Sequence, residues 1–192
     1  MEKKEFTMML AGKKLTLQTG LFGNQSDGAV SVSLDDTVVF ASAMMGSVRQ
    51  DVDFFPLLVD YEEKYYAAGK IKGSRFVKRE GRPSEKATLN SRLIDRPIRP
   101  LFPKGMVNDV QLICSVLSAD LEVEPATTAL IAASAALCIS GMPFGGPVAA
   151  VRIGLIKDKD GKEQLVINPT YKQIEEGRLD LVVAGTSDAI TM

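Results

Sequence analysis

The order of strand-like and helix-like segments constrains the fold more than any other feature of this sequence. Four short apolar segments near the N-terminus are separated by turn-forming residues and predict antiparallel hairpins: residues 6–9, 14–17, 29–34 and 38–43. Further along, a buried strand is predicted at Asp109–Ala119, and Pro125 starts a helix of small residues that ends before Gly141. Strands and helices do not alternate regularly, so we predict an α+β fold in which a mixed sheet packs with helices.

The remaining segments predict shorter elements. Ser84 can cap a helix that extends to Arg96, and Pro97 and Pro100 predict that this helix does not continue far. Residues 61–72 have no clean periodicity and are expected to form a loop or an irregular helix. Strands are predicted at residues 54–59, 148–156, 164–167 and 180–184, with a charged hairpin tip at 157–162 and a short helix at 170–176.

Length and composition indicate a folded cytoplasmic protein. The chain has 192 residues, of which 45% are hydrophobic, and this is enough to bury a sizeable core. No apolar run approaches the roughly 20 residues that a membrane span needs. The charged residues 1–5 are not followed by the apolar segment of a signal peptide. We therefore expect a cytoplasmic location and no membrane partner.

The chemistry available to the chain is limited by the absence of histidine. Histidine is the commonest general base and the commonest metal ligand, so any catalysis would need carboxylates, lysine or a borrowed residue. Cys114 and Cys138 each lie in an apolar stretch, and we expect two buried thiols. The glycine-rich phosphate motifs G-x-x-x-x-G-K-[ST] and G-x-G-x-x-G are also absent, which disfavours the two nucleotide-binding folds that use them.

Positive charge is concentrated in one segment. Residues 70–104 contain eleven Lys and Arg against three acidic residues, a net charge of +8, whereas the whole chain has a net charge of −1 and the remainder therefore −9. Such a segment can hold a polyanion locally, although a solvated run of charges fits the composition equally well. Turn-forming residues at 73–74 and 81–84 predict that residues 76–79 lie on an exposed loop.

Two motifs within this region identify a family. Residues 69–84 read Gly-Lys-Ile-Lys-Gly-Ser-Arg-Phe-Val-Lys-Arg-Glu-Gly-Arg-Pro-Ser, and residues 91–103 read Ser-Arg-Leu-Ile-Asp-Arg-Pro-Ile-Arg-Pro-Leu-Phe-Pro. These motifs closely resemble the first core domain of bacterial polynucleotide phosphorylases. The resemblance extends over essentially the whole chain, including residues 134–137, 141–144, 168–169 and 179–186. It implies an RNase PH-like fold of the ribosomal protein S5 domain 2-like type.

The resemblance also implies an activity for the complete protein. Members of the family are phosphorolytic 3′-to-5′ exoribonucleases, in which inorganic phosphate attacks the terminal RNA linkage and nucleoside diphosphates are released. They contain two RNase PH-like domains in one chain, form homotrimeric rings around a channel, and carry KH and S1 domains. We therefore expect mRNA turnover as the role, inorganic phosphate as co-substrate, and Mg²⁺ bound outside this chain. The expected partners are single-stranded RNA, two further copies of the protein and components of an RNA-degradation complex.

The same resemblance divides the chain. Residues 1–144 are expected to form the N-terminal part of the first RNase PH-like domain, and residues 145–192 the C-terminal part of the same unit. The chain stops in what should be another strand, so we expect this unit to be truncated.

The RNA-binding residues follow from the alignment with the family. The channel constriction of the family is a loop usually written Phe-Phe-Arg-Arg, and it aligns with Phe76-Val77-Lys78-Arg79. An aromatic ring can stack on a base, and cations can follow the phosphates without reading the sequence. We expect RNA contacts at Phe76, Lys78 and Arg79, and also at Arg82.

Three further arginines permit two interpretations. Arg92, Arg96 and Arg99 share one helical face if the helix continues. They could face RNA phosphates, or they could form ion pairs that hold the domain or the trimer interface together.

The resemblance implies that this domain has no catalytic site of its own. The active second domain of the family builds its phosphate site from a Gly-Ser-Ser-Ser turn. The matching turn here, Asp120–Pro125, has no glycine and contains three acidic residues that would repel phosphate. The Asp-x-Asp-x-Lys stretch of the family matches Arg178–Val182, in which Asp180 alone is kept. We expect Asp180 to be structural, and predict no catalytic and no metal-binding residue in the chain.

Two alternatives remain open from the sequence. The chain could be a non-catalytic RNA-binding or scaffold subunit of an exosome-like ring. It could also be a structural domain in which the basic segment pairs with the acidic remainder of the chain.

Overall fold

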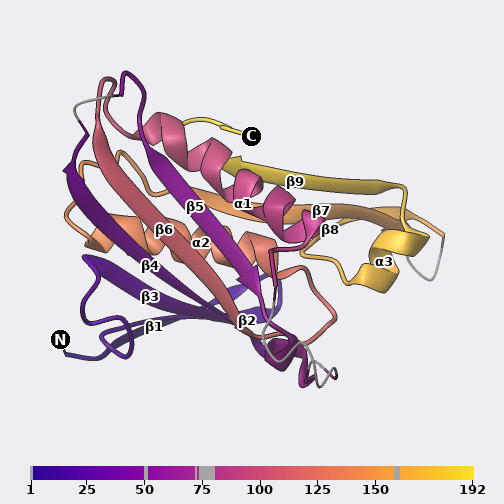
Figure 1. The fold of residues 1–192 in the computed structure, drawn as a ribbon. Coiled ribbons are helices and arrows are strands. Elements are labelled where there is room, and N and C mark those ends of the chain that lie inside the picture. Colours follow the sequence, from indigo (N-terminus) through magenta and orange to yellow (C-terminus); the bar gives the residue numbers. More distant parts are fainter. Residues whose placement is uncertain (1, 50–51, 72, 74–80, 158–160) are drawn as a thin grey trace.

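The computed structural model of the protein describes residues 2–49, 52–71, 73, 81–157 and 161–192. These residues form two sheets and two long helices, and one of the helices packs against both sheets (Figure 1). The first sheet has the strand order β1-β2-β3-β4-β6-β5, and the second has the order β8-β7-β9. A mixed sheet packed with helices agrees with the predicted α+β class.

The first sheet is built mainly from hairpins. It consists of β1 (Lys4–Leu10), β2 (Lys13–Thr19), β3 (Gly28–Leu34), β4 (Thr37–Val48), β5 (Leu57–Glu63) and β6 (Asn108–Ser118). All neighbours in this sheet are antiparallel except β5 and β6, which are parallel. The sheet is therefore mixed, and the parallel pair needs the long crossover through residues 64–107.

The second sheet is smaller and entirely antiparallel. It contains β7 (Ala149–Lys157), β8 (Glu163–Ile167) and β9 (Leu179–Gly185), with β7 in the centre. The short helix α3 (Tyr171–Glu176) connects β8 to β9, and the Thr170 side chain accepts a hydrogen bond from the backbone N–H of Gln173 at its start. This cap matches the helix that the sequence predicted at residues 170–176.

The two long helices are α1 (Glu85–Ile98) and α2 (Pro125–Ile139). Pro125 begins α2 at the position where a missing backbone N–H costs least. Small residues allow α2 to lie close to β3, β4 and β6 on one side and to β7 on the other. The helix is buried almost all round, with Ala129, Leu130 and Leu137 fully inaccessible, and it forms the centre of the core.

The structure differs from the sequence-based prediction at several places, among them β5, the segment that follows it and Cys138. β5 starts at Leu57 and not at residue 54, and Phe54 is exposed. The segment predicted as a loop or irregular helix at 61–72 begins with the last residues of β5 and continues as a 3-10 turn at Tyr65–Ala68. Cys114 is buried as predicted, but the prediction for Cys138 was wrong, because this residue near the end of α2 is exposed.

Within the described residues, no helix is both long enough and apolar enough to span a membrane.

Candidate nucleic-acid interface

Three of the four residues predicted to bind RNA cannot be placed. Phe76, Lys78 and Arg79 lie outside the described residues. Arg82 is described and exposed, and it lies just before Ser84, the residue that caps α1. The Ser84 hydroxyl accepts a hydrogen bond from the backbone N–H of Ala87 at 3.0 Å, which fixes the first turn of α1 next to Arg82.

Arg92 and Arg96, for which the sequence allowed either RNA contacts or ion pairs, lie on the outer face of α1. The residues that α1 buries are on the opposite side of the helix: Ala87, Asn90, Ile94, Pro97 and Ile98. Arg92 and Arg96 are exposed, and neither has an acidic partner in the part of the chain that the structure describes. These two side chains are therefore available to a partner from outside.

Arg99, in contrast, is used within the domain. Its guanidinium donates two hydrogen bonds to the carboxylate of Asp95, at 2.8 and 3.1 Å. It also donates to the backbone carbonyl oxygens of Phe55 and Leu57, at 2.9 and 3.0 Å. Through these contacts, Arg99 holds the end of α1 against the start of β5.

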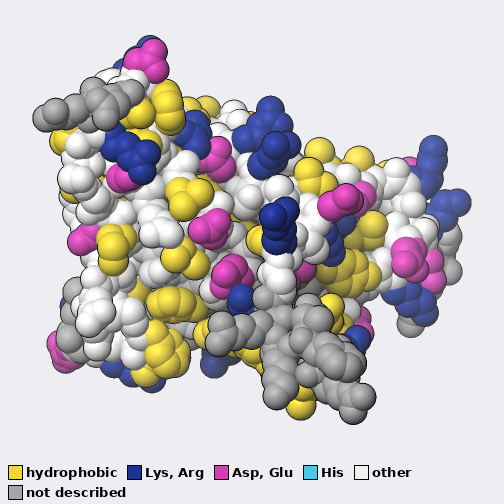
Figure 2. Space-filling model, viewed as in Figure 1, with side chains coloured by type: hydrophobic (Ala, Val, Ile, Leu, Met, Phe, Trp, Pro, Cys, Tyr) yellow, Lys and Arg dark blue, Asp and Glu magenta, His cyan; other side chains and the backbone are white. Residues whose placement is uncertain are grey.

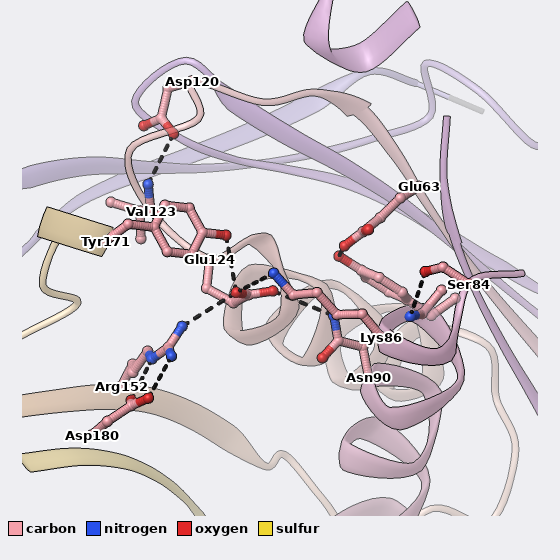
Figure 3. A network of polar contacts seen from close by, with 12 residues as sticks. Glu63, Ser84, Lys86, Asn90, Asp120, Val123, Glu124, Arg152, Tyr171 and Asp180 are labelled. Carbon is pink, nitrogen blue, oxygen red and sulfur yellow. Dashed lines mark hydrogen bonds and ion pairs between the residues drawn. The ribbon is translucent and has the colours of Figure 1, made fainter. Parts of the chain in front are cut away.

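A buried carboxylate connects the two helices to the second sheet. The side chain of Glu124, at the N-cap of α2, is only 8% exposed. One of its oxygens, Oε2, contacts Lys86 of α1 at 3.0 Å, Arg152 of β7 at 3.2 Å and the hydroxyl of Tyr171 of α3 at 2.9 Å. Figure 3 shows these side chains converging on Glu124 from three elements.

The network continues into the second sheet and into α1. Arg152 forms a bidentate pair with Asp180 of β9, in which both nitrogen–oxygen distances are 2.7 Å. On the other side, the side-chain amide of Asn90 donates to Glu124 Oε1 at 3.3 Å. The two carboxylates thus hold β7, β9, α1 and α3 around the start of α2.

The surroundings of Glu124 stabilise its charged form. Burial alone would raise its pKa, but the hydrogen bond and charge of Lys86, with Tyr171 and Arg152, lower the pKa below the ordinary value of 4.5. Burial and the charge of Glu124 raise the pKa of Tyr171 to about 12, so its hydroxyl stays a donor at neutral pH. The hydrogen bond from Arg152 lowers the pKa of Asp180.

In the turn before α2, a carboxylate of the turn itself accepts hydrogen bonds from the backbone amides. Asp120 Oδ1 accepts hydrogen bonds from the backbone N–H groups of Glu122 and Val123, at 2.9 and 3.1 Å. These two amides of the turn therefore already have an acceptor. The repulsion that we expected from three acids needs modification, since Lys86 and Arg152 compensate the charge of Glu124. The stronger obstacle to phosphate is that Asp120 already takes up the turn amides.

A cavity of about 540 Å³ lies between the end of β5, the start of α1 and the turn before α2. Tyr61, which is almost fully buried, forms part of its wall and donates from its hydroxyl to Glu63 Oε1 at 2.8 Å. Arg82 and Lys70, both from the basic segment, also line the cavity. The candidate interface therefore includes a concave part as well as the outer face of α1.

The basic segment is not uniformly positive in the folded protein. Lys86 and Arg99 have acidic partners, whereas Arg82, Arg92 and Arg96 have none in the described ranges. Figure 2 shows Lys and Arg side chains interspersed with Asp and Glu side chains on the face drawn. The net charge of +8 therefore overstates the positive potential at this surface. For the binding of an anionic partner, the individual cations without acidic partners matter more than the total charge.

Sequence reasoning missed the network around Glu124. The residues that contact Glu124 directly are 28 to 47 residues away from it in the chain, and no periodic pattern connects them. Asp180 was expected to be structural, and its pairing with Arg152 supports that interpretation. The only local signal is the position of Glu124 directly before the proline that starts α2.

The described residues do not fit a divalent metal. They contain no group of three or more Asp, Glu, Cys or His side chains that could hold one. Both carboxylate oxygens of Asp180 are taken by Arg152, and Glu124 is surrounded by cations.

Curated proteins with known names match almost the whole length of the chain. It is 55% identical to the polyribonucleotide nucleotidyltransferase of Gloeobacter violaceus over 182 residues, which are 94% of this chain and 25% of that protein. It is 54% identical to the corresponding protein of Staphylococcus saprophyticus, over 100% of this chain and 26% of that protein. The chain thus spans about a quarter of the length of these curated relatives. The identities confirm the resemblance to polynucleotide phosphorylases.

Solved structures show the same fold at low sequence identity. An Archaeoglobus fulgidus exosome described as having RNA bound to the active site matches with a TM-score of 0.64 and 16% identity, covering 100% of this chain and 75% of that one. Rice Rrp46 matches with a TM-score of 0.68 and 11% identity, covering 100% of this chain and 78% of that one. The RNase PH model for domain 1 of the 3′ exoribonuclease family matches residues 11–143, and the model for domain 2 matches residues 146–192. The chain belongs to the 3′ exoribonuclease (RNase PH) family.

Proposed function

We propose that this chain is the RNA-binding first core domain of a phosphorolytic 3′-to-5′ exoribonuclease and that it lacks a catalytic site of its own. The complete enzyme would degrade RNA with inorganic phosphate to nucleoside diphosphates, as part of mRNA turnover. Support comes from the 53–58% identity to polyribonucleotide nucleotidyltransferases over at least 94% of the chain.

The proposal depends on one contrast in the described structure. Arg82, Arg92 and Arg96 are exposed and unpaired among the described residues, so they can neutralise RNA phosphates. At the start of α2, however, Asp120 occupies the turn amides and Glu124 is enclosed by Lys86 and Arg152. The surface can therefore hold a polyanion, but the turn offers no cradle for an attacking phosphate.

The proposal extends to the whole assembly. The complete protein would be a cytoplasmic homotrimer that binds Mg²⁺ outside this chain and works with partners of an RNA-degradation complex. Residues 1–144 and 145–192 would be two parts of one RNase PH-like unit. The position of all six strands of the first sheet before residue 144 is consistent with this division.

RNA binding and phosphorolysis can be measured on the same purified chain. We expect its affinity for single-stranded RNA to fall steeply with salt, because binding releases counterions. Replacing Lys78 and Arg79 together by alanine should weaken binding to all sequences similarly and reduce the slope of log affinity against log salt by about 1.4. The control, Lys13→Ala with Lys14→Ala, makes the same change of charge on the hairpin between β1 and β2.

The same samples test the missing catalytic site. With RNA and inorganic phosphate, the chain should release no nucleoside diphosphate. Release of nucleoside diphosphate that depends on phosphate would refute the degenerate assignment. Absence of salt-dependent RNA binding would instead favour the purely structural domain. An effect of the control pair equal to that of Lys78 and Arg79 would refute the loop assignment.

A further inference from the structure

The cavity beside Arg82 has the size and the lining of a small-molecule site. Its volume of about 540 Å³ lies within the range of about 300–1,000 Å³ that is typical of ligand pockets. It is formed where β5, the start of α1 and the turn before α2 meet, and α1 is fixed there by the Ser84 cap. The packing of α1 against β5 and α2 holds these elements in place.

The inner wall of the cavity is apolar. Ala67, Ala119 and Val123 line it, and all three pack against or within the core. Tyr61 closes the wall from behind: it is only 2% exposed, and its hydroxyl is already satisfied by Glu63. A flat apolar or aromatic group could enter without leaving this hydroxyl unpaired.

The rim of the cavity carries cations without acidic partners. Lys70 and Arg82 line it, are exposed, and form no ion pair within the described ranges. Two acids also line the cavity: Glu62 contacts Lys64 at 3.4 Å, and Glu63 accepts a hydrogen bond from Tyr61 but keeps its negative charge. Among the described residues that line the cavity, this one acid, Glu63, stands against the two cations Lys70 and Arg82. Asp120 and Glu122 of the turn are not part of the wall. An anionic group at the mouth would therefore meet Lys70 and Arg82 first.

We propose that this cavity binds a nucleoside phosphate, with the base against the apolar wall and the phosphate at Lys70 and Arg82. The ligand needs one flat, weakly polar body and one anionic group, and a nucleotide combines both. Two sources supply this chemistry: a free nucleotide, or one nucleotide unit of a bound RNA strand. The second source rests on the proposed function, whereas the first does not.

Calorimetric titration of the full chain with adenosine 5′-monophosphate tests the site. Ala68→Phe places a ring in the cavity from the 3-10 turn, and Arg82→Ala removes a rim cation. Each should weaken binding at least about tenfold, because the ring of the first variant takes up the space of the base and the second variant loses a phosphate contact. Arg178→Ala makes the same change of charge on an exposed residue that does not line the cavity, and should bind like the parent chain. Equal melting temperatures would establish that all variants are folded.

Ribose 5-phosphate and a short oligoadenylate complete the experiment. Ribose 5-phosphate should bind at least about tenfold more weakly than the nucleotide, because it lacks the base.

The oligoadenylate distinguishes the two sources of the nucleotide. Loss of oligoadenylate affinity in Ala68→Phe would identify RNA as the source, and unchanged affinity would identify the free nucleotide; both outcomes support the cavity as a binding site. No binding of adenosine 5′-monophosphate, or binding that Ala68→Phe leaves unchanged, would overturn the proposal. Salt-dependent RNA binding by the parent chain is measured separately, so failure of the cavity and failure of the proposed function are distinguishable.

Discussion

Glu124 shows how one residue acquires its role from distant parts of the chain. In the sequence it is one of three acids in a turn, and its charge suggested repulsion of phosphate. In the structure its carboxylate is buried and receives contacts from α1, β7 and α3. Its partners offset the cost of burying the charge, so removal of one side of these contacts would destabilise the protein.

Replacing Glu124 by glutamine should make the free energy of unfolding less sensitive to a fall in pH into the acid range. At neutral pH, we expect the variant to lose about 2 kcal/mol, since charge-assisted hydrogen bonds from Arg152 and Tyr171 are weakened and the more exposed Lys86 contributes less. The folded-state pKa of Glu124 is lowered, so its contribution is complete above the ordinary value of 4.5 and is lost as the pH falls through the folded-state pKa.

Urea unfolding of the parent chain and the variant at several pH values measures this difference. The difference in unfolding free energy should shrink as the pH falls below about 4.5. Glu175→Gln, on the exposed side of α3, is the matched control and should remain close to the parent at every pH. A difference that stays constant down to acid pH would contradict the role of the charged form.

At the scale of single elements, α1 follows closely from local sequence. Ser84 was predicted to cap it, and the Ser84 side chain does so. The helix extends to Ile98, two residues beyond the predicted Arg96, and a 3-10 turn at Arg99–Leu101 follows. Pro97 and Pro100 are consistent with this short continuation, because proline removes a backbone donor from the helix.

Removing the cap should destabilise α1 by a predictable amount. We expect Ser84→Ala to lower the free energy of unfolding by about 1 kcal/mol, because the N–H of Ala87 loses its acceptor. Ser91→Ala is a suitable control on the same helix, since that hydroxyl only donates to the carbonyl oxygen of Thr88 one turn earlier. Chemical denaturation of both variants tests this. Equal stabilities would show that the cap contributes nothing.

At the scale of the whole molecule, α2 is the element that joins the two sheets. It packs against the first sheet through β3, β4 and β6, and the hydroxyl of Ser134 accepts a hydrogen bond at 2.9 Å from the backbone N–H of Val148 just before β7. The approach to β3 is close enough to require glycine. A Cβ atom on Gly28 would overlap the carbonyl oxygen of Ala136 and lie 2.9 Å from Cβ of Ser140.

Gly28→Ala should therefore disturb the packing between α2 and the first sheet. We expect a loss of about 1–3 kcal/mol or more, because the obstructing atom belongs to the backbone and cannot rotate away. Gly73→Ala is the control: a Cβ atom there meets nothing within 4 Å. Thermal unfolding should show a lower midpoint for the first variant and an unchanged midpoint for the second. Similar midpoints for both would contradict the close approach.

The sequence by itself determined the elements whose signals are local. The N-terminal hairpins, the cap at Ser84 and the small-residue helix that starts at Pro125 depend on turn chemistry, capping and apolar pattern, which act between residues close in the chain. The family resemblance likewise came from contiguous motifs. The start of β5 was misplaced, because its parallel pairing with β6 is a contact across about 50 residues.

Only the tertiary structure decided which charges are compensated. It assigned Lys86 and Arg99 to internal partners, left Arg92 and Arg96 exposed, and enclosed Glu124 between three elements. It also formed the cavity beside Arg82 from β5, α1 and the turn before α2. The physical reason is that ion pairing and cavity shape depend on distances in space, and segments far apart in the chain supply the two sides of each contact.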